Sequence, residues 1–451
     1  MTYDLVVAGG RLVTNDGTYP GSIGISGGRI AAVSQGALSG HEVIEARGQV
    51  VLPGVVDLHV HFNEPGRTQW EGWGPGSRAA AAGGVTTVVE MPLNAIPPTT
   101  SAAALEAKVA AARTQSIVDF ALWGGLITDN RPHLAELAAG GVIGFKAFMS
   151  HSSTEEFTHV EDGVLYDGLC RLRDLGHFLA VHAESNALTA ERMARLQAQG
   201  RRDRRAWGEG RPPVAELEAI QRALFLARDA GCRLHIVHMS LPEGVEMIRA
   251  ARAAGHPVTV ETCPHYLVLT EDDMVRLGPV AKCAPPLRDA ARQHGLWGAV
   301  LGGDIDCITS DHSPCPTQDK TRGDDDIWQA WGGISGIQTL APLMLTEGVH
   351  RRGLSLNRFA DLMSTNPAKI AGLWPRKGEI RIGADADLVL VDLDREWPVD
   401  ASRLYSRHRH SPFVGWKMKG WIQRVFLRGR TVAVEGEVTG ARDGVWLRAG
   451  S

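Results

Sequence analysis

The sequence contains little that would favour a membrane, secreted or nucleic-acid-binding protein. None of its apolar runs approaches the ~20 residues that a helix needs to cross a bilayer. The first residues, MTYDLVVAGG, lack a basic region followed by a long apolar stretch, so we expect no secretion signal. Lysine and arginine number 47 against 51 acidic residues, a net charge of −4. That balance gives no electrostatic reason to expect nucleic acid or an anionic membrane as a partner.

The six cysteines form no C-x-x-C pair and lie mostly in apolar, strand-like stretches. We therefore expect buried free thiols rather than a disulfide framework. A reducing cytoplasm is the simplest compartment for such a chain, and we predict that location.

Glycine is abundant, at 52 of 451 residues, and it breaks both ends of the chain into short strands. The segments DLVVAGGRLV and IGISGGRIAAV near the start resemble EIRIGADADLVLVDL and WIQRVFLRGRTVAVEG near the end. We infer that the two ends pair into one composite β-sandwich domain. Its predicted bounds are residues 1–52 and 375–451.

The middle of the chain, residues 53–374, alternates apolar strands with alanine-rich helical stretches. Eight such strands predict a parallel (β/α)8 barrel of the TIM type. A doubly wound open sheet is the alternative, but no G-x-G-x-x-G opens a helix and the β-rich ends fit it poorly. The predicted strands are 55–62, 85–92, 119–126, 142–149, 178–184, 233–240, 258–266 and 305–314.

Metal-ligating residue types stand at the ends of these predicted strands. His59 and His61 follow the first strand, and alternate side chains of a strand share a face, so this pair forms half of a metal site. Barrel enzymes carry their chemistry at the carboxyl ends of the strands. The other predicted strand ends add Lys146, His182, His238 and Asp311.

Other histidines serve as internal controls for this interpretation. His408 and His410 also form an H-x-H pair, but they lie among arginines and follow no apolar strand, which indicates a solvated loop. His235 and His238 differ by an odd number, so we expect them on opposite faces with only His238 in the barrel. His312 neighbours Asp311 and is expected to face away.

Lys146 needs a separate explanation, because an ammonium group would repel a divalent cation. Burial near cations favours loss of its proton. A neutral amine can add carbon dioxide to form a carbamate, whose two oxygens can bridge two metals. The alternative is a lysine buried by packing or held in a structural ion pair.

These motifs resemble the cyclic amidohydrolases, a group that includes dihydroorotases, hydantoinases and allantoinases. The resemblance covers essentially the whole chain. Within the group, residues 65–100 and the stretches DHSPCP and AWGGISGIQTL look most like bacterial allantoinases. The motifs that carry the resemblance are D-x-H-x-H (Asp57, His59, His61), G-F-K-A-F around Lys146, V-H-A-E at His182, I-V-H-M-S at His238 and S-D-H-S-P at Asp311.

The resemblance implies a binuclear metal centre. His59 and His61 would hold one metal, with Asp311 as its further ligand. His182 and His238 would hold the other metal, and carboxylated Lys146 would bridge the two. Nitrogen and oxygen ligands suit zinc, while cobalt, manganese and iron also fit such a set.

The expected reaction is hydrolysis of a cyclic amide. Water between two cations ~3.5–4 Å apart becomes hydroxide at physiological pH. Asp311 would accept the proton of this hydroxide and deliver it to the departing ring nitrogen. The second metal would polarise the carbonyl, where negative charge develops.

Three positions bear on the choice of substrate. Dihydroorotases are expected to carry arginine two residues past the second histidine, where this chain has Asn63, and an amide suits a neutral ring better than an acid. His151 stands where hydantoinases would carry a tyrosine, which favours allantoin. His151 either helps to polarise the carbonyl or belongs to a lid over residues 150–163. Asn94 and Ser313 are the other candidate substrate contacts.

We therefore predict an allantoinase that opens allantoin to allantoate in purine breakdown. The alternative is a cyclic-imide hydrolase of the hydantoinase or dihydropyrimidinase type. A non-catalytic scaffold relative would be free to lose metal ligands, whereas all six positions are filled here. The expected partner is a small cyclic ureide, and the resemblance suggests a homotetramer.

Overall fold

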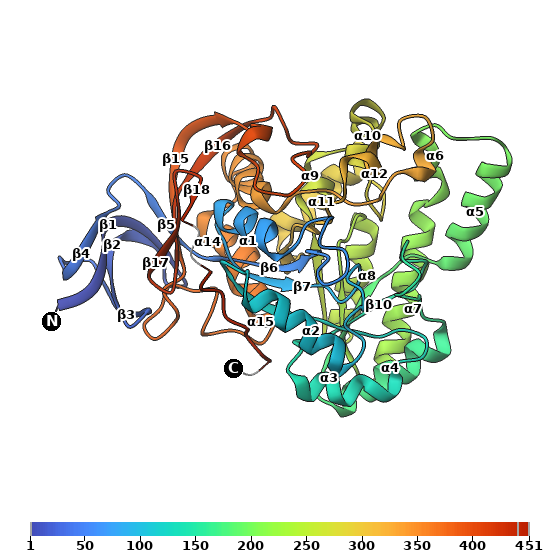
Figure 1. Cartoon of the computed structure of the whole chain (residues 1–451), viewed down its shortest axis with the longest axis horizontal. Coiled ribbons are helices and arrows are strands. Elements are labelled where there is room, and N and C mark those ends of the chain that lie inside the picture. The colour runs from blue at the N-terminus through green and yellow to red at the C-terminus, as the bar shows by residue number, and fades with distance from the viewer. Residues whose placement is uncertain (1, 440–441, 450–451) are drawn as a thin grey trace.

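The structure is a computed structural model that describes residues 2–439 and 442–449. It consists of a barrel beside a β-sheet domain that contains strands from both halves of the chain (Figure 1).

The β-sheet domain is a nine-stranded sheet made from the two ends of the chain. Strand β5 joins the halves, because it pairs in parallel with β1 and antiparallel with β15, with Leu52 opposite Val389. The strands run in the order β18-β17-β16-β15-β5-β1-β2-β3, with β4 on β1. Their bounds are β1 Thr2–Thr14, β2 Gly17–Ser26, β3 Arg29–Ser34, β4 Ser39–Glu45, β5 Val50–Pro53, β15 Leu388–Pro398, β16 Lys417–Leu427, β17 Arg430–Val434 and β18 Glu437–Val438.

The barrel strands are parallel and almost fully buried, as expected when helices cover the outside. They form a three-stranded sheet, β6-β7-β8, and a six-stranded sheet, β9 to β14 in chain order. A bridge between Val60 and His312 links the two sheets at one seam. The bounds are β6 Val55–Val60, β7 Val85–Glu90, β8 Asp119–Leu122, β9 Gly124–Gly125, β10 Phe145–Phe148, β11 Phe178–His182, β12 Arg233–Ile236, β13 Val258–Thr262 and β14 Cys307–Ile308.

Local sequence signals set the ends of several covering helices. The Ser101 hydroxyl accepts a hydrogen bond from the Ala104 amide at the start of α2, which satisfies a free helix donor. Gly231 ends α7 in the left-handed region, at φ 70°. The helices are α1 Trp73–Ala82, α2 Ala102–Arg113, α3 Leu134–Gly140, α4 Asp162–Asp174, α5 Asn186–Ala198, α6 Arg205–Gly210, α7 Pro213–Ala230, α8 Pro242–Ala253, α9 Pro264–Val268, α10 Glu271–Leu277, α11 Ala290–Gly302, α12 Thr317–Thr321, α13 Leu340–Leu343, α14 Leu356–Ala360 and α15 Asn366–Ile370.

Five 3-10 segments and two π-helical segments, η5 and η6, complete the elements of the described residues. They are η1 Arg131–His133, η2 Pro279–Ala281, η3 Ile327–Gln329, η4 Ile337–Thr339, η5 Met344–His350, η6 Asp361–Thr365 and η7 Ala401–Arg403.

The predicted fold class, a (β/α)8 barrel with a terminal β-sandwich, is confirmed. Each of the eight predicted strand segments contains a barrel strand, and the third segment contains two short ones, β8 and β9. The exact domain boundaries, 1–52 with 375–451 against 53–374, stay a prediction.

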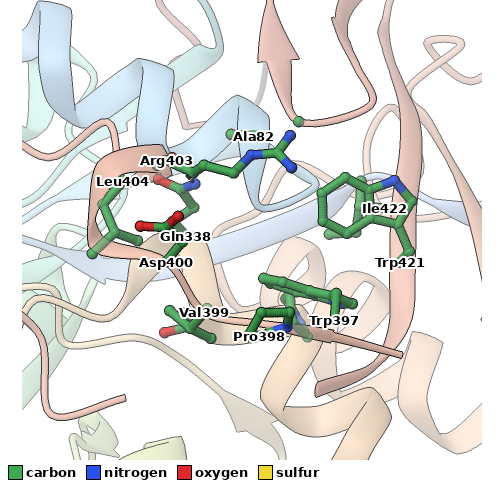
Figure 2. Close-up of a pocket in the computed structure, with 13 residues that line it drawn as sticks. Ala82, Gln338, Trp397, Pro398, Val399, Asp400, Arg403, Leu404, Trp421 and Ile422 are labelled. Carbon is green, nitrogen blue, oxygen red and sulfur yellow. Dashed lines mark hydrogen bonds between the residues drawn. The ribbon is translucent and has the colours of Figure 1, made fainter. Parts of the chain in front are cut away.

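A pocket of about 500 Å³, its open mouth included, lies where the terminal sheet meets the barrel (Figure 2). Trp397 and Trp421 form its walls, with their rings 5.0 Å apart and close to perpendicular. Both indole nitrogens have partners within the protein, the Gly420 carbonyl and the Glu435 carboxylate. None of the predicted metal ligands lines this pocket.

Two further sequence expectations concern the cysteines and the helices. All six cysteines are free thiols, and five are buried. Among the described residues, no helix combines the length and the apolar character needed to span a bilayer.

Candidate metal centre

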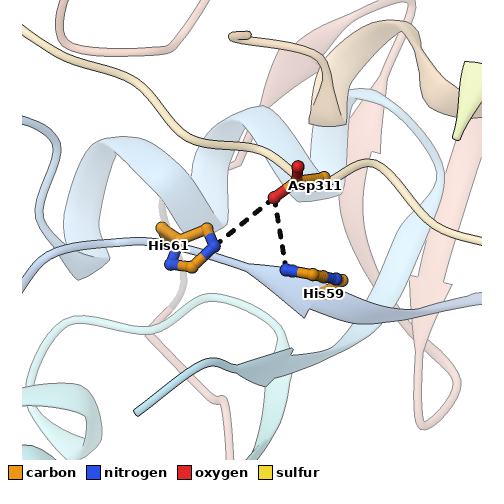
Figure 3. A group of neighbouring side chains, drawn as sticks. All are labelled: His59, His61 and Asp311. Carbon is orange, nitrogen blue, oxygen red and sulfur yellow. Dashed lines mark ion pairs between the residues drawn. The ribbon is translucent and has the colours of Figure 1, made fainter. Parts of the chain in front are cut away.

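Two histidines and one aspartate from opposite ends of the barrel sequence meet at its rim. His59 is the last residue but one of strand β6, and His61 directly follows that strand. Asp311 lies three residues after the end of β14. The Asp311 carboxylate is 3.2 Å from His59 Nε2 and 3.4 Å from His61 Nε2 (Figure 3). One ligand atom of each residue lies within 4.8 Å of the others, and all three residues are buried. This is the predicted first half of a metal site.

A second pair of imidazoles lies beside this group. His182 ends β11 and His238 follows β12; His182 Nδ1 is 3.0 Å from His238 Nε2. The His59 and His238 ring centres are 5.4 Å apart, so the two groups are neighbours. Lys146, on β10, is fully buried, and its Nζ lies 5.2 Å from the centre of the Phe148 ring, which stacks on His182. The structure thus brings all six predicted metal-site residues to one rim.

The backbone at the cluster adopts conformations that side chains other than glycine rarely take. His238 has φ 39° and Asp311 has φ 43°, and the nearby loop residues Asn63, Asn94 and Ser153 have φ between 63° and 69°. Such residues cost free energy and persist where the surrounding structure fixes them, which happens most often at functional sites.

Buried carboxylates contact one ring nitrogen of two of the imidazoles. Glu261, on β13, lies 2.5 Å from His59 Nδ1 and accepts the His238 amide at 3.2 Å. Glu184 lies 2.7 Å from His182 Nε2 and pairs with Arg211. A carboxylate on one ring nitrogen fixes the tautomer and leaves the other nitrogen with its lone pair free.

The electrostatics of the cluster disfavour a positive charge on His61, His182, His238 and Lys146 and favour the ionised form of Asp311. Burial lowers the pKa of His61 to about 4 and that of Lys146 to about 7. Burial also lowers the pKa of His182 and places that of His238 well below its ordinary value. Burial alone would raise the pKa of Asp311, but His59 and the hydrogen bond from His61 outweigh it and lower that pKa.

The residues present fit a pair of divalent cations. His182 Nε2 donates its proton to the Glu184 carboxylate, so Nδ1 of the same ring carries a lone pair and faces His238 Nε2. A cation bound by these two nitrogens would use both lone pairs. The buried Lys146 Nζ has no hydrogen-bond partner among the described residues. A buried polar group without a partner is costly, so an amine in this position favours a modified or ligand-bound state.

A cleft of about 530 Å³, its open mouth included, lies in front of the cluster. All three predicted substrate contacts, Asn94, His151 and Ser313, line it. The predicted lid also contributes Ser152 and Ser153, and the Ser152 hydroxyl donates to the Phe157 carbonyl at 2.6 Å. The cleft is large enough for a small heterocycle.

Asn63 and the control histidines are each placed clearly by the structure. Asn63 is buried, donates weakly to the Pro314 carbonyl at 3.4 Å and does not line the cleft. His312 lies away from the cleft, against Glu71 at 3.5 Å.

The expectation that His235 faces away from the site is wrong. His235 Nε2 lies 3.2 Å from the same Glu261 that binds His59 and the His238 amide. Strand β12 ends at Ile236, and the left-handed backbone of His238 breaks the alternation on which the prediction rested.

The expectation of a solvated loop at His408 and His410 also needs correction. Both residues are partly buried. His408 Nε2 donates to the Gln69 carbonyl at 2.8 Å, and His410 Nε2 donates to the Cys315 carbonyl at 2.9 Å.

A profile of the amidohydrolase family matches residues 50–432, which include both barrel rims and every predicted ligand. The chain belongs to the amidohydrolase family. This amidohydrolase is 48% identical to the allantoinase of Rubrobacter xylanophilus over 447 residues, covering 99% of the chain and 98% of that relative. It is 46% identical to the allantoinase of Solibacter usitatus, with 99% and 97% covered, and 42% identical to that of Escherichia coli, with 96% and 95% covered.

Solved structures give a second comparison for this amidohydrolase. An L-hydantoinase (dihydropyrimidinase) from Arthrobacter aurescens is 39% identical with a TM-score of 0.97, and covers 99% of this chain and 100% of its own. A dihydropyrimidinase from Brevibacillus agri is 30% identical with a TM-score of 0.91, covering 98% of each chain.

Sequence reasoning missed several residues that surround the centre of this amidohydrolase. Glu261 carried a signal, because a lone carboxylate inside the apolar strand VTVET has to find a buried partner. Arg211 and Trp331 line the cleft but carried none, since each follows a loop whose path depends on the rest of the barrel.

Proposed function

We propose that this protein hydrolyses the cyclic amide bond of allantoin to give allantoate. The observation that carries the proposal is identity of 42–48% with curated allantoinases over 96–99% of the chain. The buried cluster of His59, His61 and Asp311 supports a hydrolytic, metal-dependent reaction.

We propose that two divalent ions, zinc in the first instance, complete the centre. His59, His61 and Asp311 would hold one ion, and His182 and His238 the other. Lys146 would lie between them as a carbamate formed with carbon dioxide. When bound, such ions act as Lewis acids and lower the pKa of water.

The chain's own residues supply the proton transfers and the fit of the ring. Asp311 has a lowered pKa and is therefore ionised at neutral pH, so it can accept a proton from the attacking water. It then delivers that proton to the departing ring nitrogen. Asn94, His151 and Ser313 would orient the ring, since all three line the cleft.

The decisive experiment compares four rings with one preparation of metal-loaded protein. Allantoin, 5-substituted hydantoins, dihydrouracil and dihydroorotate are each incubated and the opened products quantified. We expect the highest kcat/KM with allantoin and none with dihydroorotate. Rapid turnover of dihydrouracil without turnover of allantoin would overturn the proposal, and inactivity on all four rings would favour a scaffold protein.

A hydantoinase is the second candidate function. It is favoured by one observation, the TM-score of 0.97 to the L-hydantoinase at 39% identity. In the same assay, a preference for 5-substituted hydantoins over allantoin would support it.

We further propose a homotetramer in the cytoplasm. The six free thiols are compatible with a reducing compartment. Light scattering of the purified protein tests the tetramer: a mass near four times 48.5 kDa supports it, and a monomer mass contradicts it.

A further inference from the structure

One wall of the cleft is formed by a segment with little regular structure, residues 327–333. Trp331 and Gly332 of this segment line the cleft. Only the turn Ile327–Gln329 is regular, so neither a helix nor a sheet ladder fixes the rest. The Trp331 indole donates to Ser313 at 3.3 Å, and its ring lies 4.6 Å from the Trp70 ring.

Two buried lysines hold the backbone of this segment. Lys282 Nζ donates to the Ile327 and Ala330 carbonyls at 2.8 and 2.6 Å. Lys320 Nζ donates to the Trp331 and Gly333 carbonyls at 2.8 and 2.5 Å. Lys320 also donates to the main-chain carbonyl of Lys282 at 3.2 Å, so it holds the backbone of the other lysine as well. Four of the seven carbonyls of the segment are held in this way.

Within the described part of the chain, neither Nζ has a carboxylate partner. Both side chains are at least 96% buried, and among the described residues no acidic oxygen lies within 4.0 Å of either Nζ. Burial lowers the pKa of Lys320 to about 8 and that of Lys282 well below its ordinary value. Lys282 Nζ also stands 3.9 Å from the centre of the Trp207 ring, another wall of the cleft.

A buried lysine without a carboxylate partner is costly whether or not it keeps its proton. Desolvation of an ammonium costs several kcal/mol, whereas methionine would fill a similar volume at little cost. The benefit is directional, because each Nζ offers at least two N–H donors, and these converge on carbonyls of one segment. Close approach adds to the constraint, because a Cβ on Gly333 would lie 2.4 Å from the Ser313 carbonyl.

We propose that Lys282 and Lys320 are positioning residues that hold Trp331 and Gly332 in place against the substrate ring. The substrate named here rests on the proposed hydrolysis of a cyclic ureide. The clamp, meaning the bonds from Lys282 and Lys320 to the carbonyls of residues 327–333, rests on the structure alone. Within the described residues, both Nζ atoms bond to backbone carbonyls and neither bonds to the metal-site histidines or Asp311, so the clamp acts on ring binding more than on the chemical step.

The test uses the metal-loaded full chain with Lys320→Met or Lys282→Met, and with Lys417→Met as the matched control at an exposed lysine on β16. We expect KM for allantoin to rise about tenfold with kcat within about twofold, because ground-state and transition-state binding are lost together. Hydrogen exchange followed by mass spectrometry should show the 327–333 amides exchanging about tenfold faster. Metal content and the control variant should match the parent.

A glutamine at either position keeps the test valid if the methionine variant does not fold. It supplies two donors without charge, and an intermediate rise in KM and in exchange supports the clamp. Unchanged exchange at 327–333 together with unchanged KM in folded variants overturns it. A fall in kcat with unchanged KM also overturns it. If the parent hydrolyses none of the rings, the proposed function fails, and the exchange experiment still decides the clamp.

Discussion

Single residues at this site act through the state of their protons. His61, His182 and His238 are buried near one another and near Lys146, and this environment disfavours every positive charge. A neutral imidazole keeps the lone pair that a cation needs. Asp311, in contrast, keeps its negative charge because it contacts two imidazoles.

Replacement of Asp311 by asparagine separates metal binding from proton transfer. Asn keeps an oxygen at the same place but has no basic carboxylate. We expect Asp311→Asn to retain metal and to lose about a hundredfold or more in kcat, the range typical of general acid–base catalysis. Elemental analysis and turnover of allantoin are the two measurements. Near-parent turnover in a metal-loaded variant would remove Asp311 from this role.

Replacement of Lys146 by alanine tests the carbamate. We expect loss of the paired metals and of activity, because no group would then bridge the two histidine pairs. Added short carboxylates, such as acetate or propionate, should restore part of both. Parent metal content and rate in Lys146→Ala would show that the lysine has a packing role only.

The metal-free protein should lose stability in mild acid. Burial lowers the pKa of His61 to about 4 in the fold, against 6.5 for the ordinary side chain. Between these values the unfolded chain binds a proton that the fold excludes, so the free energy of unfolding falls as the pH falls from 6.5 to 4. One group shifted this far contributes about 3 kcal/mol. Urea unfolding of chelator-treated protein at pH 7, 6 and 5 measures it, and a constant midpoint would contradict it.

At the scale of elements, parallel strands bring the site together. The carboxyl ends of parallel barrel strands share one rim, so residues hundreds of positions apart meet there. Strand β8 is the last strand of its three-stranded sheet, and its free edge is covered by residues 444–447, called the tail below. Phe120 donates its amide to the Val445 carbonyl at 3.0 Å, and Leu447 donates to the Phe120 carbonyl at 2.7 Å.

The tail should contribute to stability through Leu447, whose side chain is fully buried. Leu447→Ala leaves a cavity and should lower the free energy of unfolding by about 2–5 kcal/mol. Val445→Ala is the matched control, because Val445 is 40% exposed and its main-chain hydrogen bonds remain. Denaturant unfolding of both variants decides; equal midpoints would mean that the tail is not anchored by Leu447.

At the scale of the whole molecule, a buried charge cluster joins the barrel to the terminal sheet. Lys377 Nζ lies 2.6 Å from Asp119 on β8, 3.0 Å from Asp385 and 2.6 Å from Asp387. Arg428, which follows β16, also pairs with Asp119. Three carboxylates around one lysine hold the two parts in a fixed relation.

Lys377→Met should therefore destabilise the whole protein. It leaves buried carboxylates with less compensating charge, which typically costs about 3–5 kcal/mol. Lys369→Met, eight residues earlier and exposed, is the control. We expect a lower Tm for Lys377→Met alone, measured with metal bound. A Tm equal to that of the control would show that the cluster does not stabilise the junction.

The sequence by itself determined the barrel, the pairing of the chain ends and the identity of the candidate ligands. These depend on local patterns: apolar strands at intervals, glycine-rich turns at both ends, and histidine or aspartate at the ends of four of the predicted barrel strands. Strand alternation suffices for His59 and His61, because the pair lies at the end of β6 and both rings approach Asp311.

Only the tertiary structure decided which groups stand behind and around those ligands. Strand alternation failed at His235 and His238, where a left-handed residue follows the strand end. Glu261 reaches three residues from two other strands, and Lys282 and Lys320 meet at a loop distant from both in sequence. Such contacts depend on the paths of loops after irregular backbone turns, and no local period in the sequence encodes them.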